Sequence, residues 1–360
     1  MRDRWRVGLV GVGRGAGYGA LFADDPRSEV VAVCDISSEA VERFGDGLQL
    51  PDNARFTDYN EFVGADMDIV FVGTPMPAHC EQTIKAVQAG KHVLSEVTMA
   101  PTLDECVQIV QAVRASGKTY MLAENCIYWP FIQDWKGWVA AGRLGEIVHA
   151  EAEYLHPIPG LIFDRATNTR GWRSNRAPLH YCTHSLGPLL EIMGDRIVRG
   201  MGVGKSHKVL PEAPVGGIDM QVGLFETAKG ATIKLLRTSV LPRHPAIHYY
   251  TLHGTKGYVE TDRGGPAGTG RLYAEGEMQQ AQEIECSLID KSLPEEARKG
   301  GHGTAEYSLV HDFLDCLEAG KRPALDEVRG FELTVPGIIA HESAVNGSVW
   351  MDVPVLDRGE

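Results

Sequence analysis

The sequence predicts an α/β fold, with an N-terminal doubly wound parallel sheet followed by an α+β domain that has a large open, mostly antiparallel sheet. Three observations lead to this prediction. Short apolar runs alternate with helical patterns at the start of the chain, a glycine-rich turn follows the first run, and period-2 alternation dominates after about residue 123. Apolar strands alternating with helices are typical of a parallel sheet covered on both faces, and period-2 alternation with short turns is typical of antiparallel strands.

Five apolar runs are the expected strands of the first sheet, and three helical patterns lie between them. One helical pattern ends at Gly90, a plausible C-cap. The expected strands are 6–12, 29–35, 67–75, 91–96 and 119–125, and the expected helices lie around 37–45, 78–90 and 102–116.

The remainder of the chain begins with an amphipathic helical pattern, "FIQDWKGWVAAGRLG", and ends with two more helical patterns. Between them, alternating segments such as 146–156 read as strands. A chain of 360 residues is long for one hydrophobic core, so two domains are expected. We predict a first domain over 1–123 and a second over 124–360, with the C-terminal helix packing back on the first domain.

Amino-acid composition and net charge indicate which classes of binding partner and which cell compartment to expect. Hydrophobic residues make up 43% and charged residues 23%, as in an ordinary globular protein, and the net charge is −13. Such a surface repels nucleic acid and anionic membrane, so neither is expected as a partner, although one local site could still hold a small anionic ligand. No signal peptide or membrane helix is expected. Seven cysteines without a CxxC pair predict reduced thiols, and hence a cytoplasmic protein.

The glycine-rich turn "GLVGVGRGAGYG" predicts a dinucleotide-binding Rossmann domain. Gly11, Gly13 and Ala16 fit G-x-G-x-x-A, which allows a tight turn, a backbone approach to a pyrophosphate, and close packing of helix on strand. Asp35 ends the second run 24 residues after Gly11, where a carboxylate binds the adenosine ribose hydroxyls. The alternative is a glycine-rich turn beside a solvated aspartate. The predicted cofactor contacts in this turn are Gly11, Gly13, Arg14, Gly15 and Ala16.

No arginine immediately follows Asp35, so NAD is expected rather than NADP. Thr74 and Pro75 end the third run and should lie beside the cofactor. His79 is a further cofactor candidate, although its position favours a role in starting the next helix over a role in the chemistry. Glu96 ends the fourth run, where a carboxylate points into the ligand crevice of an α/β sheet.

With these residues and with "GTPMPAH", "AGKHVLSE", "GRLGEIVHAEAEY" and "GTKGYVE", nearly the whole chain resembles the Gfo/Idh/MocA family of NAD(P)-dependent sugar oxidoreductases. The resemblance implies a Rossmann domain followed by a domain whose open sheet mediates assembly, and therefore a homo-oligomer, either a dimer or a tetramer. The family's catalytic lysine stands in Glu-Lys-Pro. Here Val97 and Thr98 follow the glutamate.

That departure points to one branch. "SEVTMAPTLDEC", "AENCIYW", "HYCTHSLGPL" and "GHGTAEY" are similar to stretches of glycoside hydrolase family 109, whose members keep NAD as a cofactor that is not consumed. The resemblance implies functional roles for Glu96, Tyr128, Tyr181 and His184, with His302 as a further contact. Thr98 and Ser185 depart from the branch, which commonly has proline and glycine there.

Transfer of a hydride from a carbinol needs a base for the hydroxyl proton and a donor to the oxygen. Tyr181 and His184 are i, i+3 on an expected helix and share a face. We predict His184 as the base, Tyr181 and Tyr128 as hydroxyl ligands, and Glu96 as substrate anchor or proton relay. The alternative is that His184 is bonded to backbone and that both tyrosines are packed in the core.

Two further residues are predicted to contact substrate, and no metal is expected. Asn125 follows a strand end in the crevice, and Arg173 lies in an irregular basic segment, 157–178, which is a candidate substrate-facing loop. His180 and His184 have the i, i+4 spacing of metal ligands, but no third ligand is evident.

Three functions remain open. The main hypothesis is an NAD-dependent oxidoreductase acting on a sugar, a sugar derivative or a cyclitol, which stoichiometric NADH formation would support. The first alternative is a glycoside hydrolase or lyase that recycles tightly bound NAD through oxidation, elimination, addition and reduction. Solvent deuterium at C2 of its product would reveal that route. The second alternative is a non-catalytic NAD or sugar sensor, which turnover dependent on His184 would exclude.

Overall fold

The structure is a computed structural model that describes residues 4–264 and 268–357. The chain forms two compact units. The first comprises Met1–Tyr128 and Ile289–Phe331, and the second comprises Trp129–Leu288 and Glu332–Glu360. The late segment Ile289–Phe331 therefore belongs to the unit that contains the N-terminal sheet.

The first unit is built on a parallel sheet of the predicted doubly wound kind. Among the described residues it has six strands in the order β3-β2-β1-β4-β5-β6. From β1 the chain adds strands outward to β3 on one side, and then returns to add β4 to β6 on the other side of β1. Ligands bind at the carboxyl ends of the strands that flank such a switch point. The strands are β1 (Trp5–Val10), β2 (Ser28–Cys34), β3 (Arg55–Phe56), β4 (Ile69–Val72), β5 (His92–Ser95) and β6 (Tyr120–Leu122).

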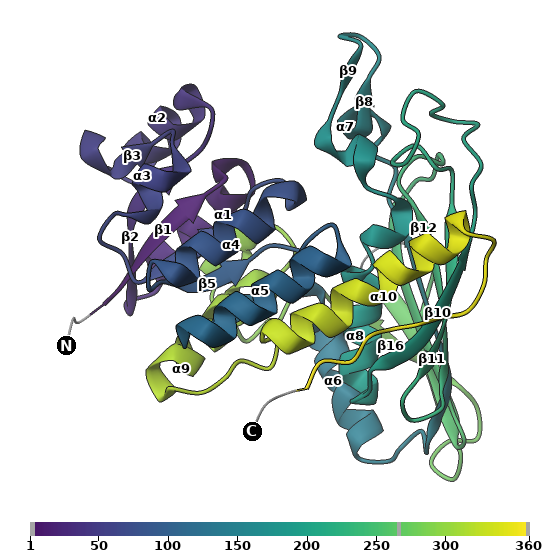
Figure 1. Cartoon of the computed structure of the whole chain (residues 1–360). Helices are drawn as coiled ribbons and strands as arrows, with labels where there is room; N and C mark the ends of the chain where they lie inside the picture. The colour runs from purple at the N-terminus through teal and green to yellow at the C-terminus, as the bar shows by residue number, and fades with distance from the viewer. Residues whose placement is uncertain (1–3, 265–267, 358–360) are drawn as a thin grey trace. The chain divides into compact units, whose positions relative to one another are not determined.

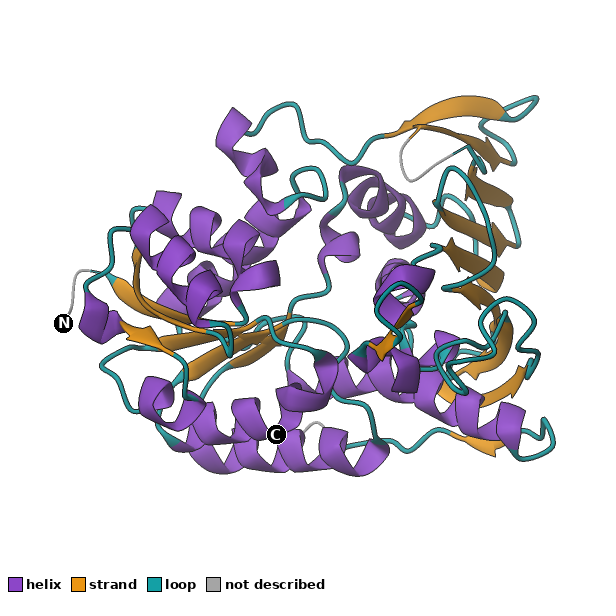
Figure 2. Cartoon of the chain, turned by 90° about the horizontal axis from the view of Figure 1, so that it is seen from above, coloured by secondary structure: helices purple, strands orange, loops and turns teal. Residues whose placement is uncertain are grey.

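Helices lie on both sides of this sheet (Figure 2), as its nearly continuous burial requires. The late helix α9 packs against α1. The helices are α1 (Val12–Asp24), α2 (Ser38–Gly47), α3 (Tyr59–Val63), α4 (His79–Gln88), α5 (Leu103–Ser116) and α9 (Ala305–Ala319), with short 3₁₀ turns η1 (Asp52–Ala54), η2 (Met76–Ala78), η3 (Asn125–Tyr128) and η6 (Glu295–Gly300).

Local signals set the ends of these helices. The Thr102 side chain accepts a hydrogen bond from the Glu105 amide at the start of α5. Gly117 ends the same helix with a φ of 64°, which glycine adopts without the penalty of a Cβ atom.

The second unit is built on a large mixed sheet, mostly antiparallel as predicted. Among the described residues it has nine strands in the order β16-β15-β14-β13-β7-β12-β11-β10-β17, and β7 pairs with β12 in parallel. The strands are β7 (Ile147–Leu155), β10 (Ile197–Val203), β11 (Gln221–Thr227), β12 (Thr232–Thr238), β13 (Ile247–Gly254), β14 (Gly257–Thr261), β15 (Gly268–Ala274), β16 (Gln282–Cys286) and β17 (Met351–Asp352).

Helices cover one face of this sheet. Helix α8 (Thr183–Met193) packs on β7 and β13, and α6 (Pro130–Ala140) packs on α8. On β7, Ala150, Ala152 and Tyr154 are buried, and Glu151 is more exposed. Helix α10 (Glu327–Val345) is drawn in yellow in Figure 1. A Cβ on Gly202 of β10 would stand 2.1 Å from the carbonyl oxygen of Ala340 in this helix.

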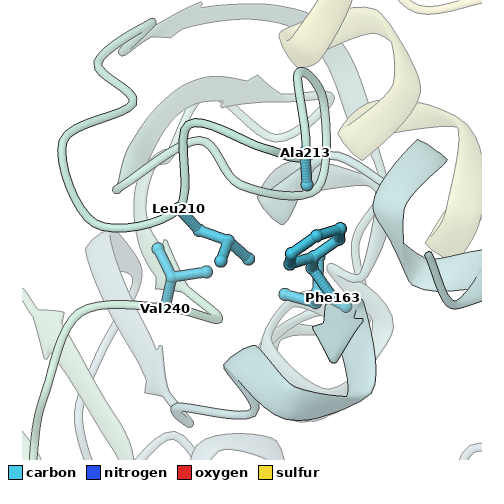
Figure 3. Close-up of a cluster of buried hydrophobic side chains, with 5 residues drawn as sticks. Phe163, Leu210, Ala213 and Val240 are labelled. Atoms are coloured by element: carbon cyan, nitrogen blue, oxygen red, sulfur yellow. The ribbon is translucent and has the colours of Figure 1, made fainter. Parts of the chain in front are cut away.

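The basic segment 157–178 is anchored by a small apolar cluster to which it contributes two residues. Ile162 and Phe163 pack with Leu210, Ala213 and Val240. Figure 3 shows Phe163 facing the other three. The segment contains α7 (Pro159–Ile162), the two-stranded ribbon of β8 (Phe163–Asp164) and β9 (Thr169–Arg170), and the turns η4 (Trp172–Asn175) and η5 (Pro178–His180).

Within residues 4–264 and 268–357, no helix has the length and hydropathy needed to span a bilayer. All seven cysteines are free thiols, and every one except Cys316 is buried.

Candidate functional site

The glycine turn after β1 has the geometry that the cofactor motif predicts. Gly11 is the N-cap of α1 with a φ of 84°. A Cβ at this position would lie 2.5 Å from the Gly73 carbonyl carbon and the Thr74 amide nitrogen. Only glycine fits such a turn, which places the first amides of α1 beside the end of β4.

Gly13 shows that the turn has room for a ligand. A Cβ at Gly13 would meet no atom within 4 Å, and the residue is exposed at the N-terminus of α1. An exposed helix N-terminus with open space above its first amides fits a pyrophosphate, because its N–H groups and helix dipole favour negative charge.

Asp35 lies directly beside this turn. Its Oδ2 accepts a hydrogen bond from the Val12 amide at 3.0 Å, and its Oδ1 accepts one from the Ser37 amide at 3.1 Å. The carboxylate is therefore held at the carboxyl end of β2, where the adenosine ribose of a dinucleotide binds.

The expected role of Ala16 in packing is wrong. Ala16 is exposed, and the glycines of α1 that face the sheet are Gly15 and Gly19. A Cβ at Gly15 would stand 3.9 Å from the Phe71 ring, and one at Gly19 would stand 2.7 Å from Leu9. Helix α1 begins at Val12, and this sets which of its residues point inward.

His79 supports the loops around the cofactor turn. Its Nε2 lies 2.9 Å from the Thr74 carbonyl oxygen and its Nδ1 lies 2.8 Å from the Thr98 carbonyl oxygen. The ring is 1% exposed, and burial lowers its pKa. His79 is also the first residue of α4, so it fixes the turn containing Thr74 and Pro75.

Three predicted site residues of the first unit converge on one buried carboxylate, that of Glu306. Its Oε1 accepts hydrogen bonds from Asn125 Nδ2 at 2.9 Å and Arg14 Nη2 at 3.0 Å, and it lies 2.5 Å from His302 Nδ1. Burial alone would raise the pKa of Glu306, but His302 and Arg14 lower it to about 2.

Arg14 joins this group to the predicted anchor Glu96. Arg14 Nε donates to Glu96 Oε1 at 2.6 Å, and the guanidinium lies over the Tyr18 ring. Glu96 Oε2 also accepts from the Val97 amide at 3.2 Å. The position that follows Glu96 thus carries a buried valine, and the cation beside the carboxylate is a guanidinium from α1.

Tyr128 is in the same unit but has a different partner. Its hydroxyl donates to Asp312 Oδ2 on α9 at 2.6 Å. The phenolic oxygen keeps lone pairs that can accept a hydrogen bond.

The second unit brings Tyr181 and His184 together at the start of α8, as their spacing predicts. Tyr181 Oη lies 3.0 Å from His184 Nε2, and the rings are edge to face. Tyr250 on β13 donates to the His184 carbonyl oxygen at 2.5 Å and fixes this turn of the helix.

The site candidate Arg173 and the neighbouring His180 have different contacts. Arg173 lies over the Trp172 ring in η4. His180 packs edge to face on His341, with ring centroids 4.6 Å apart. His180 and His184 therefore contact different residues.

Sequence reasoning missed Glu306, Asp312 and Arg237. Glu306 could have been noticed because it is i, i+4 from His302 in "GHGTAEY". Arg237 could have been noticed because strand alternation places it on the same face as Ile233 and Leu235. Asp312 gives no comparable signal, since it lies among ordinary polar residues of α9.

Comparison with known families identifies the chain. A family model described as an oxidoreductase family with an NAD-binding Rossmann fold matches residues 5–124, and the GFO/IDH/MocA C-terminal domain matches residues 132–260. The chain belongs to the Gfo/Idh/MocA family. Its first unit is thus an NAD-binding Rossmann domain of an oxidoreductase family, as predicted.

Curated relatives of this Gfo/Idh/MocA protein include the expected glycosidase branch. A glycosyl hydrolase family 109 protein of Shewanella pealeana is 28% identical, and the match covers 99% of this chain and 86% of that one. A protein of Shewanella oneidensis named alpha-N-acetylgalactosaminidase is 28% identical over 98% of this chain and 85% of its own length.

Solved structures share the fold of this Gfo/Idh/MocA chain. An oxidoreductase domain protein from Kribbella flavida has a TM-score of 0.82 at 23% identity, covering 98% of this chain and 100% of that one. A levoglucosan dehydrogenase in complex with NADH and L-sorbose has a TM-score of 0.84 at 19% identity, covering 99% and 100%. A myo-inositol 2-dehydrogenase from Lactobacillus plantarum has a TM-score of 0.77 at 19% identity, covering 98% and 100%.

Proposed function

We propose that this NAD-binding oxidoreductase acts on a carbohydrate, either a sugar, a sugar derivative or a cyclitol. Bound NAD supplies the acceptor for a hydride from the carbon that bears the reacting hydroxyl. The observation that carries the proposal is the 3.0 Å contact between Tyr181 Oη and His184 Nε2. The solved relatives named as dehydrogenases of levoglucosan and myo-inositol support the substrate class.

His184 takes the hydroxyl proton in this proposal. A neutral imidazole has a ring nitrogen that can accept the proton, whereas the phenol of Tyr181 serves better as a hydrogen-bond donor to the substrate oxygen. Valine at position 97 leaves the backbone after Glu96 without an ammonium group, so the base must come from another residue.

The first unit holds the cofactor and fixes the polar groups beside it. Gly11 and Gly13 receive the pyrophosphate and Asp35 receives the ribose. Glu96 is a substrate anchor or proton relay oriented by Arg14, and Asn125 and His302 are oriented by Glu306. Tyr128 serves as a hydroxyl ligand while it donates to Asp312.

The test is a panel of sugars and cyclitols incubated with the purified protein and NAD. NADH formed in proportion to oxidised sugar supports the proposal. A protein that fails to bind NAD in a fluorescence titration would refute it.

The second candidate function is a glycosidase that recycles its NAD. The full-length curated relatives named family 109 and alpha-N-acetylgalactosaminidase favour it. A base of this chain would then also remove the proton from C2 of a sugar oxidised at C3. Cleavage of an aryl glycoside with deuterium uptake at C2 and without net NADH would select this function, and cleavage without deuterium uptake would exclude it.

We further propose that the protein is a cytoplasmic homo-oligomer, a dimer or a tetramer, with a small-molecule substrate as its ligand. Buried free thiols suit a reducing compartment. Val203 on β10 and Leu224 on β11 are large apolar side chains that are each 40% exposed, as expected of a face that another subunit covers. Light scattering combined with size-exclusion chromatography tests the assembly.

A further inference from the structure

Three arginines of the second unit lie over the rings of Tyr181 and Trp172, and we call them the arginine cluster: Arg173, Arg176 and Arg237. The Arg176 guanidinium lies 4.3 Å from the Tyr181 ring centre, and that of Arg237 lies 5.8 Å from it. Arg173 and Arg176 both lie over Trp172. Two cations therefore flank the Tyr181 phenol, and a third shares the Trp172 ring with one of them, in a protein whose net charge is −13.

The cluster has no anionic partner among residues 4–264 and 268–357. Arg176 is 5% exposed, and its guanidinium contacts aromatic rings. Arg237 is 1% exposed, donates through Nη1 to the Tyr154 and Thr238 carbonyl oxygens, and has no partner for its Nε.

Two other partly buried arginines, Arg14 and Arg55, are paired with carboxylates. Arg14 binds Glu96 and Glu306, and Arg55 binds Glu42 and Asp46. A buried guanidinium without a counter-ion carries a large desolvation cost, and burial accordingly lowers the pKa of Arg176. Because a guanidinium stays protonated at neutral pH, a bound oxyanion would relieve that cost.

The fold holds the arginine cluster in place. Ile162 and Phe163 anchor the start of the segment in the apolar cluster of Figure 3. The Gly216 amide donates to the Ser174 carbonyl oxygen at 2.8 Å, and a Cβ on Gly216 would stand 2.1 Å from the Arg173 carbonyl oxygen. The turn η4 therefore rests directly on the 216 backbone, which is a fixed support for two of the three cations.

The arginine cluster also adjoins the predicted catalytic pair, since Tyr181 contacts Arg176 through its ring and His184 through its hydroxyl. We propose that the substrate carries an oxyanion group, a carboxylate, phosphate or sulfate, which the arginine cluster binds while the reacting hydroxyl meets Tyr181 and His184. This rests on the proposed function and names the substrate class within it. Arg176 and Arg173 are the ligands, and Arg237 positions Tyr154 and adds positive charge.

The test compares matched glycosides that differ by one charge. Methyl glucoside and methyl galactoside are paired with their uronates, 6-phosphates and 6-sulfates, and each is assayed with NAD for NADH formation or glycoside loss. We expect at least one anionic member to exceed its neutral partner by roughly 10- to 100-fold in kcat/KM, the range of a charge-assisted hydrogen bond. The preferred member identifies the source of the oxyanion.

Two variants and one control locate the effect. Arg176→Gln and Arg173→Gln should raise KM for the anionic substrate roughly 10-fold more than they raise KM for its neutral partner. Arg165→Gln is the control, because Arg165 lies in the same segment but is exposed and pairs with Glu212, so we expect no change. Arg173 is half-buried, so its variant remains informative if Arg176→Gln fails to fold.

Binding measurements with anionic sugars and with NAD distinguish a wrong oxyanion site from a wrong proposed function. Calorimetric titration of the NAD-loaded protein with glucuronate, glucose 6-phosphate and glucose 6-sulfate should show saturable binding that the Arg173 variant weakens. NAD binding and sugar turnover with equal preference for neutral and anionic members would overturn the oxyanion site alone. Loss of NAD binding by the wild-type protein would overturn the function. If nothing turns over, absence of saturable anion binding overturns the site.

Discussion

At the scale of single residues, the pair of Tyr181 and His184 is the most direct test of the chemistry. We expect His184→Ala to lower turnover by about 10²- to 10⁴-fold, the usual contribution of a general base, with unchanged NAD affinity. Tyr181→Phe keeps the ring that Arg176 contacts and should cause a smaller loss. NADH formation and an NAD titration measure both quantities.

A matched control for this pair is His253→Ala, because His253 is an exposed histidine of the same unit, on β13. It should keep wild-type turnover. Full activity in His184→Ala would show that His184 is not the general base and that its role is structural.

The buried carboxylate of Glu306 predicts a defined dependence of stability on pH. Its pKa is lowered from 4.5 to about 2, so its contribution is complete above about pH 4.5 and is lost as the pH falls towards 2. We expect Glu306→Gln to lower the free energy of unfolding at neutral pH by an amount on the order of 3 kcal/mol. The difference from wild type should narrow between pH 4.5 and 2.

Urea unfolding across that pH range measures the effect. Glu42→Gln is the control, since Glu42 is an exposed partner of Arg55 and such pairs contribute about 0–1 kcal/mol. A difference that stays constant down to pH 2 would contradict the assignment of the lowered pKa to Glu306.

At the scale of elements, the turn between β1 and α1 makes opposite predictions for two of its glycines. Gly11→Ala places a Cβ against the Gly73 and Thr74 backbone at a φ of 84°, so we expect both folding and NAD binding to suffer. Gly13→Ala meets no protein atom within 4 Å, so stability should change by no more than about 0.5 kcal/mol. Its methyl group would enter the space that a pyrophosphate needs, and NAD affinity should fall at least tenfold.

Thermal unfolding without NAD, followed by an NAD titration, separates the two effects. Gly160→Ala is a suitable control because its added Cβ also meets nothing within 4 Å, at a site far along the chain in the second unit. Unchanged NAD affinity in Gly13→Ala would place the pyrophosphate elsewhere.

Local patterns predict most elements of the fold, because apolar period and glycine turns are local properties. The five expected strands of the first sheet are present, whereas β3, with two residues, is too short to show a period. The parallel pairing of β7 with β12 could not be predicted, because it joins strands distant in sequence within an otherwise antiparallel sheet. The same limit explains Glu306, which bonds to residues 181 and 292 positions earlier.

At the scale of the whole molecule, the first unit is assembled from two distant segments. Arg14 donates to Gly300 and Glu306, Lys299 pairs with Asp24, and Arg27 pairs with Asp315. A fragment of residues 1–128 lacks all of these partners. We expect it to unfold without a cooperative transition and to bind NAD poorly, as circular dichroism and an NAD titration would show.

A fragment that unfolds cooperatively and binds NAD as the full chain does would show that the late segment is dispensable. Adding a peptide of residues 289–331 in trans is the complementary measurement. Partial recovery of the cooperative transition would support the contribution of η6 and α9.

Because Ile289–Phe331 belongs to the unit of the N-terminal sheet, it also limits how early this unit can fold during translation. Translation must continue for about 180 residues after Tyr128 before Glu306 exists, a delay of roughly ten to forty seconds at usual elongation rates. During that interval Arg14 and Asn125 lack their hydrogen-bond acceptor, Glu306. The nascent chain also exposes the surface of α1 that α9 covers in the folded protein. Chaperone demand in the cell should therefore concentrate in this window.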